Sequence, residues 1–125
     1  MSFEDLKDKV LSWADDKDLL HAENADKQFM KFIEEVFEFR VEMVDFINRI
    51  ELSKRTNIYD KFSGDMVQKN MKLEMGDIFV TLIILCEQIG IDPEECLSMA
   101  YEKIKGRSGR TINGTFVKEE DLIDE

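Results

Sequence analysis

Two pairs of acidic residues have the spacing of metal ligands on helices. Glu35 and Glu38 form the first pair, and Glu74 and Asp77 form the second. Residues three apart lie on one face of a helix, so each pair presents two carboxylates side by side. If the two helices pack together, the four carboxylates converge, and they cannot all stay ionised unless a cation lies among them. Carboxylate oxygens suit Mg²⁺, with Mn²⁺ as its substitute, and protein-bound Mg²⁺ usually accompanies a phosphorylated substrate.

A cluster of basic residues near the C-terminus complements these acids. It contains Lys103, Lys105, Arg107 and Arg110, and Lys31 lies one turn before the first acidic pair. Lys103 and Arg107 are neighbours if the helix that contains Lys103 lasts one more turn. These cations predict a clamp for the phosphate oxygens of a substrate bound at the metal. The alternative is that they interact with the negative end of a helix dipole.

Both acidic pairs also have an interpretation that involves no metal. The acids around Glu35 and Glu38 lie opposite the apolar face of their segment, where a solvated helix normally keeps its charges. Glu74 and Asp77 lie toward the N-terminus of theirs, where acidic groups favour the helix dipole. Periodicity alone leaves these interpretations open beside the metal site.

The elements that must position these residues are helices. Hydrophobic periodicity predicts four of them, at about residues 3–14, 26–52, 66–89 and 93–105. The second has an apolar face over about half of its circumference, and the third is apolar almost all round from Ile78, which is typical of a central, buried helix. Asn113 and Gly114 predict a type I′ turn in a hairpin at about residues 110–118. A polar loop is expected at 53–65.

Helix boundaries near the C-terminus have clear signals. Gly90 suits the position after a helix, and Asp92 followed by Pro93 is typical of a helix start. Polar segments are expected at 15–26 and, frayed, at 119–125. The fold class predicted is therefore all-α: a single domain over the 125 residues, a four-helix bundle protomer with a short C-terminal β-hairpin.

Composition excludes several classes of function. The chain is 43% hydrophobic and 36% charged, with a net charge of −11, which disfavours binding to nucleic acid or to an anionic membrane surface. We expect no membrane span and no signal peptide, because the longest apolar run is short and the N-terminus is acidic. Cys86 and Cys96 lie outside any CxxC motif and predict reduced thiols in a cytoplasmic protein, with Cys86 in the core. The nine phenylalanines are expected to be mostly core residues, and the single histidine disfavours zinc and di-iron sites.

The motifs, taken in order, resemble the small single-domain, phage-type members of the MazG-like all-α NTP pyrophosphohydrolases. The similar segments are Trp13-Ala14, Gln28-x-x-Lys31-x-x-Glu34-Glu35-x-x-Glu38, Glu74-x-Gly76-Asp77, Gly90-Ile91-Asp92, Lys103-x-Lys105-Gly106-Arg107, Gly109-Arg110 and Asn113-Gly114. Each short motif is weak by itself, whereas the ordered set covers most of the chain and is fairly specific. One departure is the connection between the two acidic pairs: 35 residues separate Glu38 from Glu74, more than is usual in the family, and the extra length falls in 53–65.

The resemblance implies an activity and a set of residue roles. Family members hydrolyse a nucleoside triphosphate, here a dNTP or a non-canonical NTP, to the monophosphate and pyrophosphate. The implied Mg²⁺ ligands are Glu35, Glu38, Glu74 and Asp77. Glu34 or Glu35 would orient or deprotonate the attacking water. The implied substrate-binding residues are Gln28, Lys31, Lys103, Arg107 and Arg110.

The resemblance also implies assembly as a homodimer or homotetramer, and the large apolar surface of the second and third helices is compatible with burial at such an interface. Two other functions use the same features. The chain could be a non-catalytic module that binds nucleotide or metal, because binding needs the same residues as catalysis. It could also be a plain protein-interaction bundle, in which the acidic pairs form solvated faces. The base, the sugar and the phosphorus that water attacks stay open.

Overall fold

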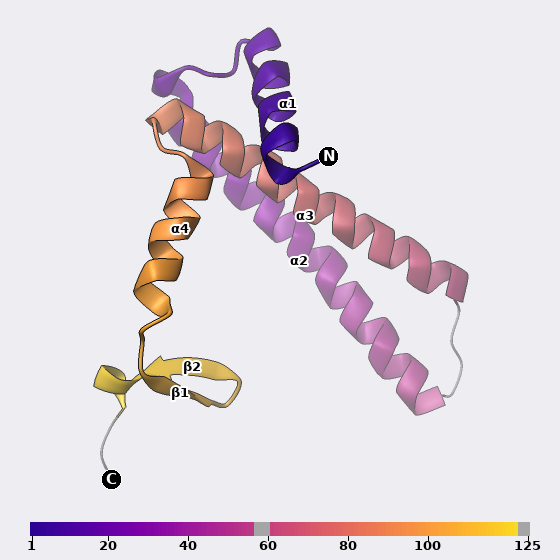
Figure 1. Cartoon of the computed structure of the whole chain (residues 1–125). Coiled ribbons are helices and arrows are strands. Elements are labelled where there is room, and N and C mark those ends of the chain that lie inside the picture. The colour runs from indigo at the N-terminus through magenta and orange to yellow at the C-terminus, as the bar shows by residue number, and fades with distance from the viewer. Residues whose placement is uncertain (57–60, 123–125) are drawn as a thin grey trace. The chain divides into compact units, whose positions relative to one another are not determined.

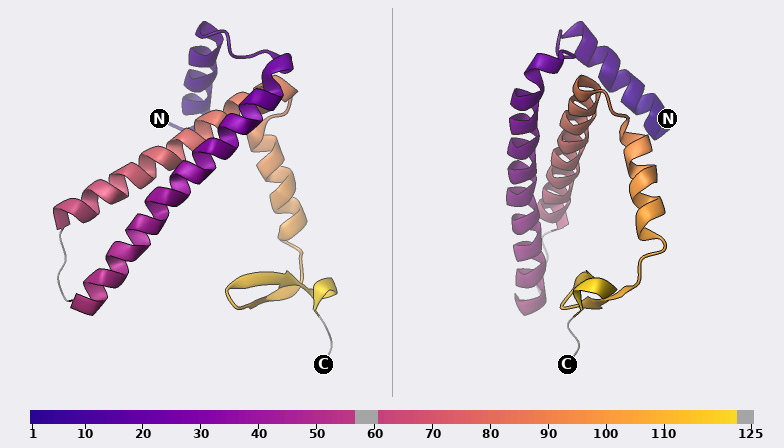
Figure 2. Two further views of the ribbon diagram at one scale, coloured as in Figure 1. Left: turned by 180° about the vertical axis from the view of Figure 1, so that it is seen from behind. Right: turned by 90° about the vertical axis from the view of Figure 1, so that its left-hand side faces the viewer.

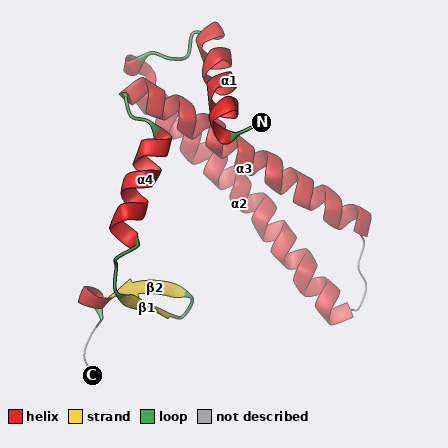
Figure 3. Ribbon diagram, in the orientation of Figure 1, coloured by secondary structure: helices red, strands yellow, loops and turns green. Residues whose placement is uncertain are grey.

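The computed structural model describes residues 1–56 and 61–122 of the chain. Its elements in chain order are α1 (Phe3–Asp16), the 3₁₀ turn η1 (Ala22–Asn24), α2 (Ala25–Thr56), α3 (Lys61–Ile89), α4 (Pro93–Ile104), β1 (Gly109–Ile112), β2 (Thr115–Lys118) and the 3₁₀ turn η2 (Glu119–Asp121). The prediction of four helices and a C-terminal hairpin is confirmed (Figures 1 and 3). The chain divides into two compact units, residues 1–90 and 91–125, which are described separately.

In the first unit, α2 and α3 run antiparallel and pack against each other, and they diverge toward the end where α2 finishes and α3 begins (Figure 2). Two side-chain hydrogen bonds tie this unit together across long sequence separations. Gln28 Nε2 of α2 donates to the carbonyl oxygen of Thr81 at 3.2 Å, and Gln88 Nε2 of α3 donates to the carbonyl oxygen of Leu19 at 2.7 Å. Polar side chains therefore fix how α3 packs against α2 and against the segment before it.

Helix α1 begins with a capping box that the prediction at residues 3–14 did not include. Asp5 N donates to Ser2 Oγ at 3.1 Å, and Ser2 N donates to Asp5 Oδ2 at 3.0 Å. The helix continues to Asp16 and ends where Asp18 adopts a positive φ of 60°. The polar segment predicted at 15–26 is therefore shorter than expected, because helix occupies both of its ends and η1 lies within it.

The loop predicted at 53–65 is wrong at both ends. Helix α2 continues to Thr56, where Lys54 and Arg55 are good helix formers that also suit the negative end of the dipole. Helix α3 already begins at Lys61 and runs through Gly64, since one glycine costs a helix only about 1 kcal/mol. The remaining part of the predicted loop, residues 57–60, lies outside the described residues.

The hydrophobic core of the first unit is small. Its buried apolar side chains are Ala14, Val67, Ile83, Ile84 and Cys86. The prediction that Cys86 is a core residue is confirmed. The prediction that the aromatic residues are mostly core is wrong, because Phe3, Phe29, Phe37 and Phe79 all count among the exposed side chains.

The second unit contains α4 and the hairpin. Asp92 caps α4 by accepting a hydrogen bond from Glu95 N at 3.0 Å. The strands pair antiparallel from Gly109 opposite Lys118 to Ile112 opposite Thr115. Asn113 and Gly114 both have positive φ, at 51° and 79°, as the predicted type I′ turn requires. Of the tail expected to be frayed, η2 is a 3₁₀ turn, and residues 123–125 lie outside the described part.

Candidate metal centre

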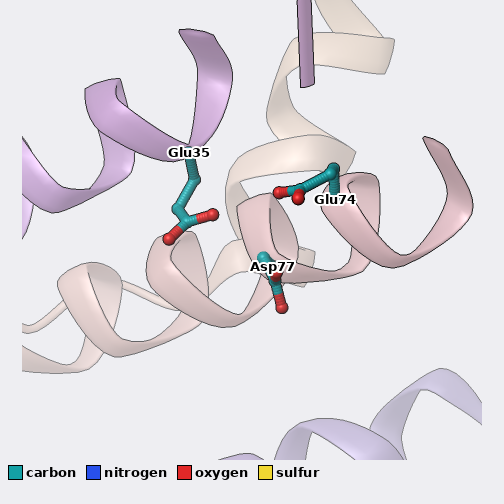
Figure 4. A group of neighbouring side chains, drawn as sticks. All are labelled: Glu35, Glu74 and Asp77. Atoms are coloured by element: carbon teal, nitrogen blue, oxygen red, sulfur yellow. The ribbon is translucent and has the colours of Figure 1, made fainter. Parts of the chain in front are cut away.

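Helices α2 and α3 bring three carboxylates together. Glu35 projects from α2 toward α3, where Glu74 and Asp77 lie one turn apart (Figure 4). One carboxylate oxygen from each residue lies within 4.8 Å of the corresponding oxygen of the other two. The convergence predicted from the two acidic pairs is therefore found for three of the four residues. The antiparallel packing of the helices creates it, because Glu35 lies 39 or more positions from Glu74 and Asp77 in the sequence.

The burial of these carboxylates favours a cation among them. Glu35 is only 7% exposed, and its Oε2 atom has no hydrogen-bond partner. Glu74 Oε2 is likewise buried and without a partner. Lys31 pairs only with the other oxygen of Glu35, Oε1, so both Oε2 atoms stay buried and unpaired. Burying such an atom without a partner is costly, and a metal ion coordinated by both Oε2 atoms would offset that cost. The residues present therefore fit a hard divalent cation, for which carboxylate oxygens are the preferred ligands. The alternative that the acids of α2 all lie on a solvated face is wrong for Glu35.

Glu38, the fourth predicted ligand, lies beside the group of three. It is exposed to solvent, one turn after Glu35 on α2. The negative charge of Glu35 raises the pKa of Glu38, and partial burial, a hydrogen bond with Glu35 and the charge of Glu74 act in the same direction. The Glu38 carboxyl therefore interacts electrostatically with the site without belonging to the group of three. Its role as a metal ligand stays a prediction.

Glu42 is a further acid near Glu74, and the sequence analysis did not assign it to the site. Burial raises the pKa of Glu74 first, and the charges of Asp77, Glu35 and Glu42 raise it further. Glu42 is half-buried on α2, seven residues after Glu35 and therefore on the same face of the helix. That spacing of seven was the signal in the sequence. The site thus concentrates more negative charge than the two predicted pairs supply.

Lys31 pairs with one of these carboxylates. Its Nζ lies 3.2 Å from Glu35 Oε1 and 3.6 Å from Glu34 Oε1. A hydrogen bond to Glu35, and then the charge of Glu34, raises the pKa of Lys31. Glu34, predicted with Glu35 to act on water, is exposed on the outer side of α2. Lys31 therefore reaches the edge of the site from the solvent side.

Gln28, predicted to bind substrate, lies two turns before Glu35 on the same side of α2. Its amide donates to the carbonyl oxygen of Thr81, so the side chain joins α2 to α3. Its role in substrate binding stays a prediction, and the structure gives it a second role in packing.

The predicted phosphate-binding residues of the second unit differ from one another in their surroundings. Lys103 is exposed in the last turn of α4, and Arg110 is exposed on β1. Helix α4 ends at Ile104, so Arg107 lies beyond it and is not the helical neighbour of Lys103 that a longer helix would have provided. Lys105 is paired with Glu102 at 2.6 Å. The clamp predicted from these residues is thus not a row along one helix.

Comparisons with protein-family models, with curated proteins and with solved structures give no match for this chain. None of the helices in the described residues combines the length and the apolar character that crossing a membrane requires. The residues and geometry of the carboxylate site are therefore the structural features that bear on function.

Proposed function

We propose that this chain is a divalent-cation-dependent nucleoside triphosphate pyrophosphohydrolase of the MazG-like kind. The single observation that carries this proposal is the meeting of Glu35, Glu74 and Asp77 across two helices, with two buried carboxylate oxygens lacking partners. The ordered motifs that resemble this family add to it. The substrate would be a dNTP or a non-canonical NTP, and the products a nucleoside monophosphate and pyrophosphate.

In this proposal the three carboxylates hold Mg²⁺, or Mn²⁺ in its place, and Glu38 contributes from the solvent side. A bound divalent ion supplies charge neutralisation for phosphate oxygens and lowers the pKa of water. Glu35, or its exposed neighbour Glu34, orients the attacking water and accepts its proton. Such a reaction needs positioning and electrostatic stabilisation more than a protein nucleophile.

Positively charged side chains would bind the phosphates. Lys31 lies at the edge of the carboxylate site, where it now contacts Glu34 and Glu35. Lys103, Arg107 and Arg110 would supply further positive charge, since a triphosphate and the acids of the site both need neutralising. The protein would act as a homodimer or homotetramer, as the resemblance implies, and the apolar surface of α2 and α3 would be buried at the interface.

The test is pyrophosphate release from a panel of canonical and modified NTPs and dNTPs, with Mg²⁺ and with EDTA. We expect metal-dependent release from one or a few substrates. Asp77→Asn should abolish that release while the far-UV circular dichroism of the protein stays unchanged. Glu87→Gln is the matched control, because Glu87 is an exposed acid of the same helix outside the site.

Two results would contradict the proposal. Release by Asp77→Asn at the wild-type rate would remove the carboxylate site from the reaction. Tight Mg²⁺-dependent nucleotide binding by the wild type, with no release from any substrate, would instead favour a non-catalytic nucleotide-binding module, which uses the same ligands.

A further inference from the structure

A mainly apolar groove lies between α1 and α3, one helical turn from the carboxylate site. Its volume is about 350 Å³. The described residues that line it are Leu6, Lys9, Val10 and Trp13 of α1 and Val80 of α3. We name it the Trp13 groove. Val80 follows Asp77 by three residues, so the two side chains are neighbours on the surface of α3. A molecule held at Asp77 can therefore extend directly into the groove.

Contacts at both ends of α1 hold this helix against α3 and fix the walls of the Trp13 groove. At the start of α1, the rings of Phe3 and Phe79 meet edge to face, with their centroids 6.2 Å apart. Just beyond its end, the carbonyl oxygen of Leu19 accepts the hydrogen bond from Gln88. The groove is therefore formed before any ligand binds, as small-molecule sites usually are.

The lining of the Trp13 groove suits a flat aromatic ring. Trp13 is 50% exposed, so its indole offers a surface on which a nucleobase can stack. Leu6, seven residues earlier and on the same side of α1, is 48% exposed and supplies further apolar contact. The volume is near the lower limit for small-molecule sites, which suits one base with its sugar.

The position of the groove favours a nucleotide over an unrelated apolar ligand. A nucleotide joins a flat, largely apolar base to charged phosphates through one sugar, so it needs two different subsites next to each other. The Trp13 groove offers the first kind, and the carboxylate site with a bound cation would offer the second. Asp77 and Val80, one turn apart on α3, join the two.

The polar side-chain groups of the groove's described lining are all hydrogen-bond donors. Lys9 Nζ and Trp13 Nε1 donate and cannot accept. Lys9 has no ion-pair or hydrogen-bond partner among the described residues, and its long stem can follow the apolar wall. Guanine and thymine present carbonyl oxygens as acceptors, whereas adenine and cytosine present amino groups, which are donors. A lining of donors therefore favours bases that carry a carbonyl oxygen in place of the amino group.

We propose that the Trp13 groove binds the base of a nucleotide whose phosphates lie at the carboxylate site. The base stacks on Trp13, and a carbonyl oxygen of the base accepts a hydrogen bond from Lys9. The preferred bases are therefore uracil, thymine, hypoxanthine and guanine, ahead of adenine and cytosine. This inference rests on the proposed function for the position of the phosphates, whereas recognition of the base by the groove needs neither metal nor turnover.

The first test is the fluorescence of Trp13, the single tryptophan of the chain, titrated with deoxynucleosides in EDTA. Deoxyinosine and deoxyadenosine form one matched pair, and deoxyuridine and deoxycytidine form another, because each pair differs by a carbonyl oxygen in place of an amino group. We expect saturable quenching, with the carbonyl member of each pair binding at least about 5-fold more tightly.

Lys9→Met should remove the difference within each pair and keep the quenching. Lys17→Met is the control, because Lys17 is an exposed lysine just after α1 and outside the groove. Absence of saturable quenching by all four deoxynucleosides would overturn the proposal and leave the groove to a protein surface. Equal affinities within both pairs would overturn the base preference.

The second test is pyrophosphate release from dITP and dATP with Mg²⁺. We expect Trp13→Ala to raise KM for dITP at least about 10-fold, and Trp13→Phe to restore most of that loss because it keeps an aromatic face. Circular dichroism should show that the helices of both variants remain. A wild-type KM in Trp13→Ala overturns the proposal and leaves hydrolysis standing. Conversely, pair-selective quenching by deoxynucleosides without release from any nucleotide would support the groove and overturn the proposed hydrolysis.

Discussion

The two faces of α2 differ in the residues that they present: the face toward α3 carries polar and acidic groups, whereas the opposite face carries exposed apolar side chains. The face that packs against α3 carries the buried carboxylate of Glu35, with Gln28 two turns before it and Glu42 two turns after it. The opposite face carries Met30 and Val41 in contact with solvent. A surface helix of a globular protein normally has apolar residues inside and charges outside, and Glu35 and Val41 depart from that pattern.

Both faces of α2 leave the isolated chain less stable than it would be with a bound cation and a covering protein surface. Burying an ionised group costs several kcal/mol unless it is paired, and each large apolar side chain left exposed forgoes about 1.5–3 kcal/mol of burial. A chain folded this way is stabilised when a cation binds inside and another protein surface covers the outside. The inner face of α2 is therefore the place to look for chemistry, and the outer face the place to look for assembly.

The largest expected effect is a difference in turnover and Mg²⁺ affinity between two variants, with one substitution on each face of α2. We expect Glu35→Gln to lower turnover by at least about 100-fold and to weaken Mg²⁺ binding, because a buried ligand loses its charge. Val41→Gln, on the outer face, should leave the affinity for Mg²⁺ unchanged. Isothermal titration with Mg²⁺ and pyrophosphate release measure the two quantities. Equal loss of Mg²⁺ affinity in both variants would break the distinction between the faces.

Metal binding should also stabilise the folded protein through the inner face. A ligand that binds only the folded state adds about 2.7 kcal/mol of unfolding free energy at 100 times its Kd. We expect Mg²⁺ to give the wild type a stabilisation of that order in thermal or urea unfolding, and to give Asp77→Asn little. Glu87→Gln should respond as the wild type does. Equal stabilisation of Asp77→Asn would place the bound metal elsewhere.

Without metal, the inner face should make stability depend on pH. The pKa values of Glu38 and Glu74 are raised in the folded protein, by the charge of Glu35 and by burial, respectively, as the first causes. The folded state therefore binds more protons than the unfolded state, and stability falls as pH rises from the ordinary pKa through the raised one. We expect Glu74→Gln to lose part of this slope in EDTA and to be more stable than the wild type at neutral pH.

Thermal unfolding of both proteins from pH 4.5 to 8 measures this difference. Comparing the two profiles isolates Glu74, because His21, whose pKa is raised by Asp18, contributes equally to both. Saturating Mg²⁺ should flatten the wild-type profile. Identical slopes in EDTA would show that Glu74 carries no excess charge penalty in the folded state.

The sequence predicted those parts of the molecule that depend on local rules. The cap at Asp92, the turn at Asn113 and Gly114, and the same-face spacing of Glu74 and Asp77 all follow from short-range stereochemistry. The convergence of the acidic pairs was predicted only on the condition that the helices pack together.

Other features could not be predicted, because tertiary packing decides them. Glu35 and Glu38 have the same chemistry and adjacent turns, yet only Glu35 is buried. The rotation of α2 against α3 selects between them. Likewise, aromatic character predicts a core position, although Phe37 on α2 is exposed. The polar composition of residues 53–65 predicts a loop, whereas helix occupies residues 53–56 and 61–65.

The smallest effect concerns Gln28, which the resemblance assigns to substrate and the structure assigns to packing. Its hydrogen bond to the carbonyl oxygen of Thr81 is 3.2 Å long and joins the inner face of α2 to α3. We expect Gln28→Leu to lower the free energy of unfolding by about 1 kcal/mol, the usual net worth of such a bond. Urea unfolding measures this, and KM measured on the same protein tests the other role. A raised KM with unchanged stability would move Gln28 to the substrate. A loss of stability with unchanged KM would show that Gln28 contributes to packing and not to substrate binding. The functional part of the inner face of α2 would then begin at Lys31.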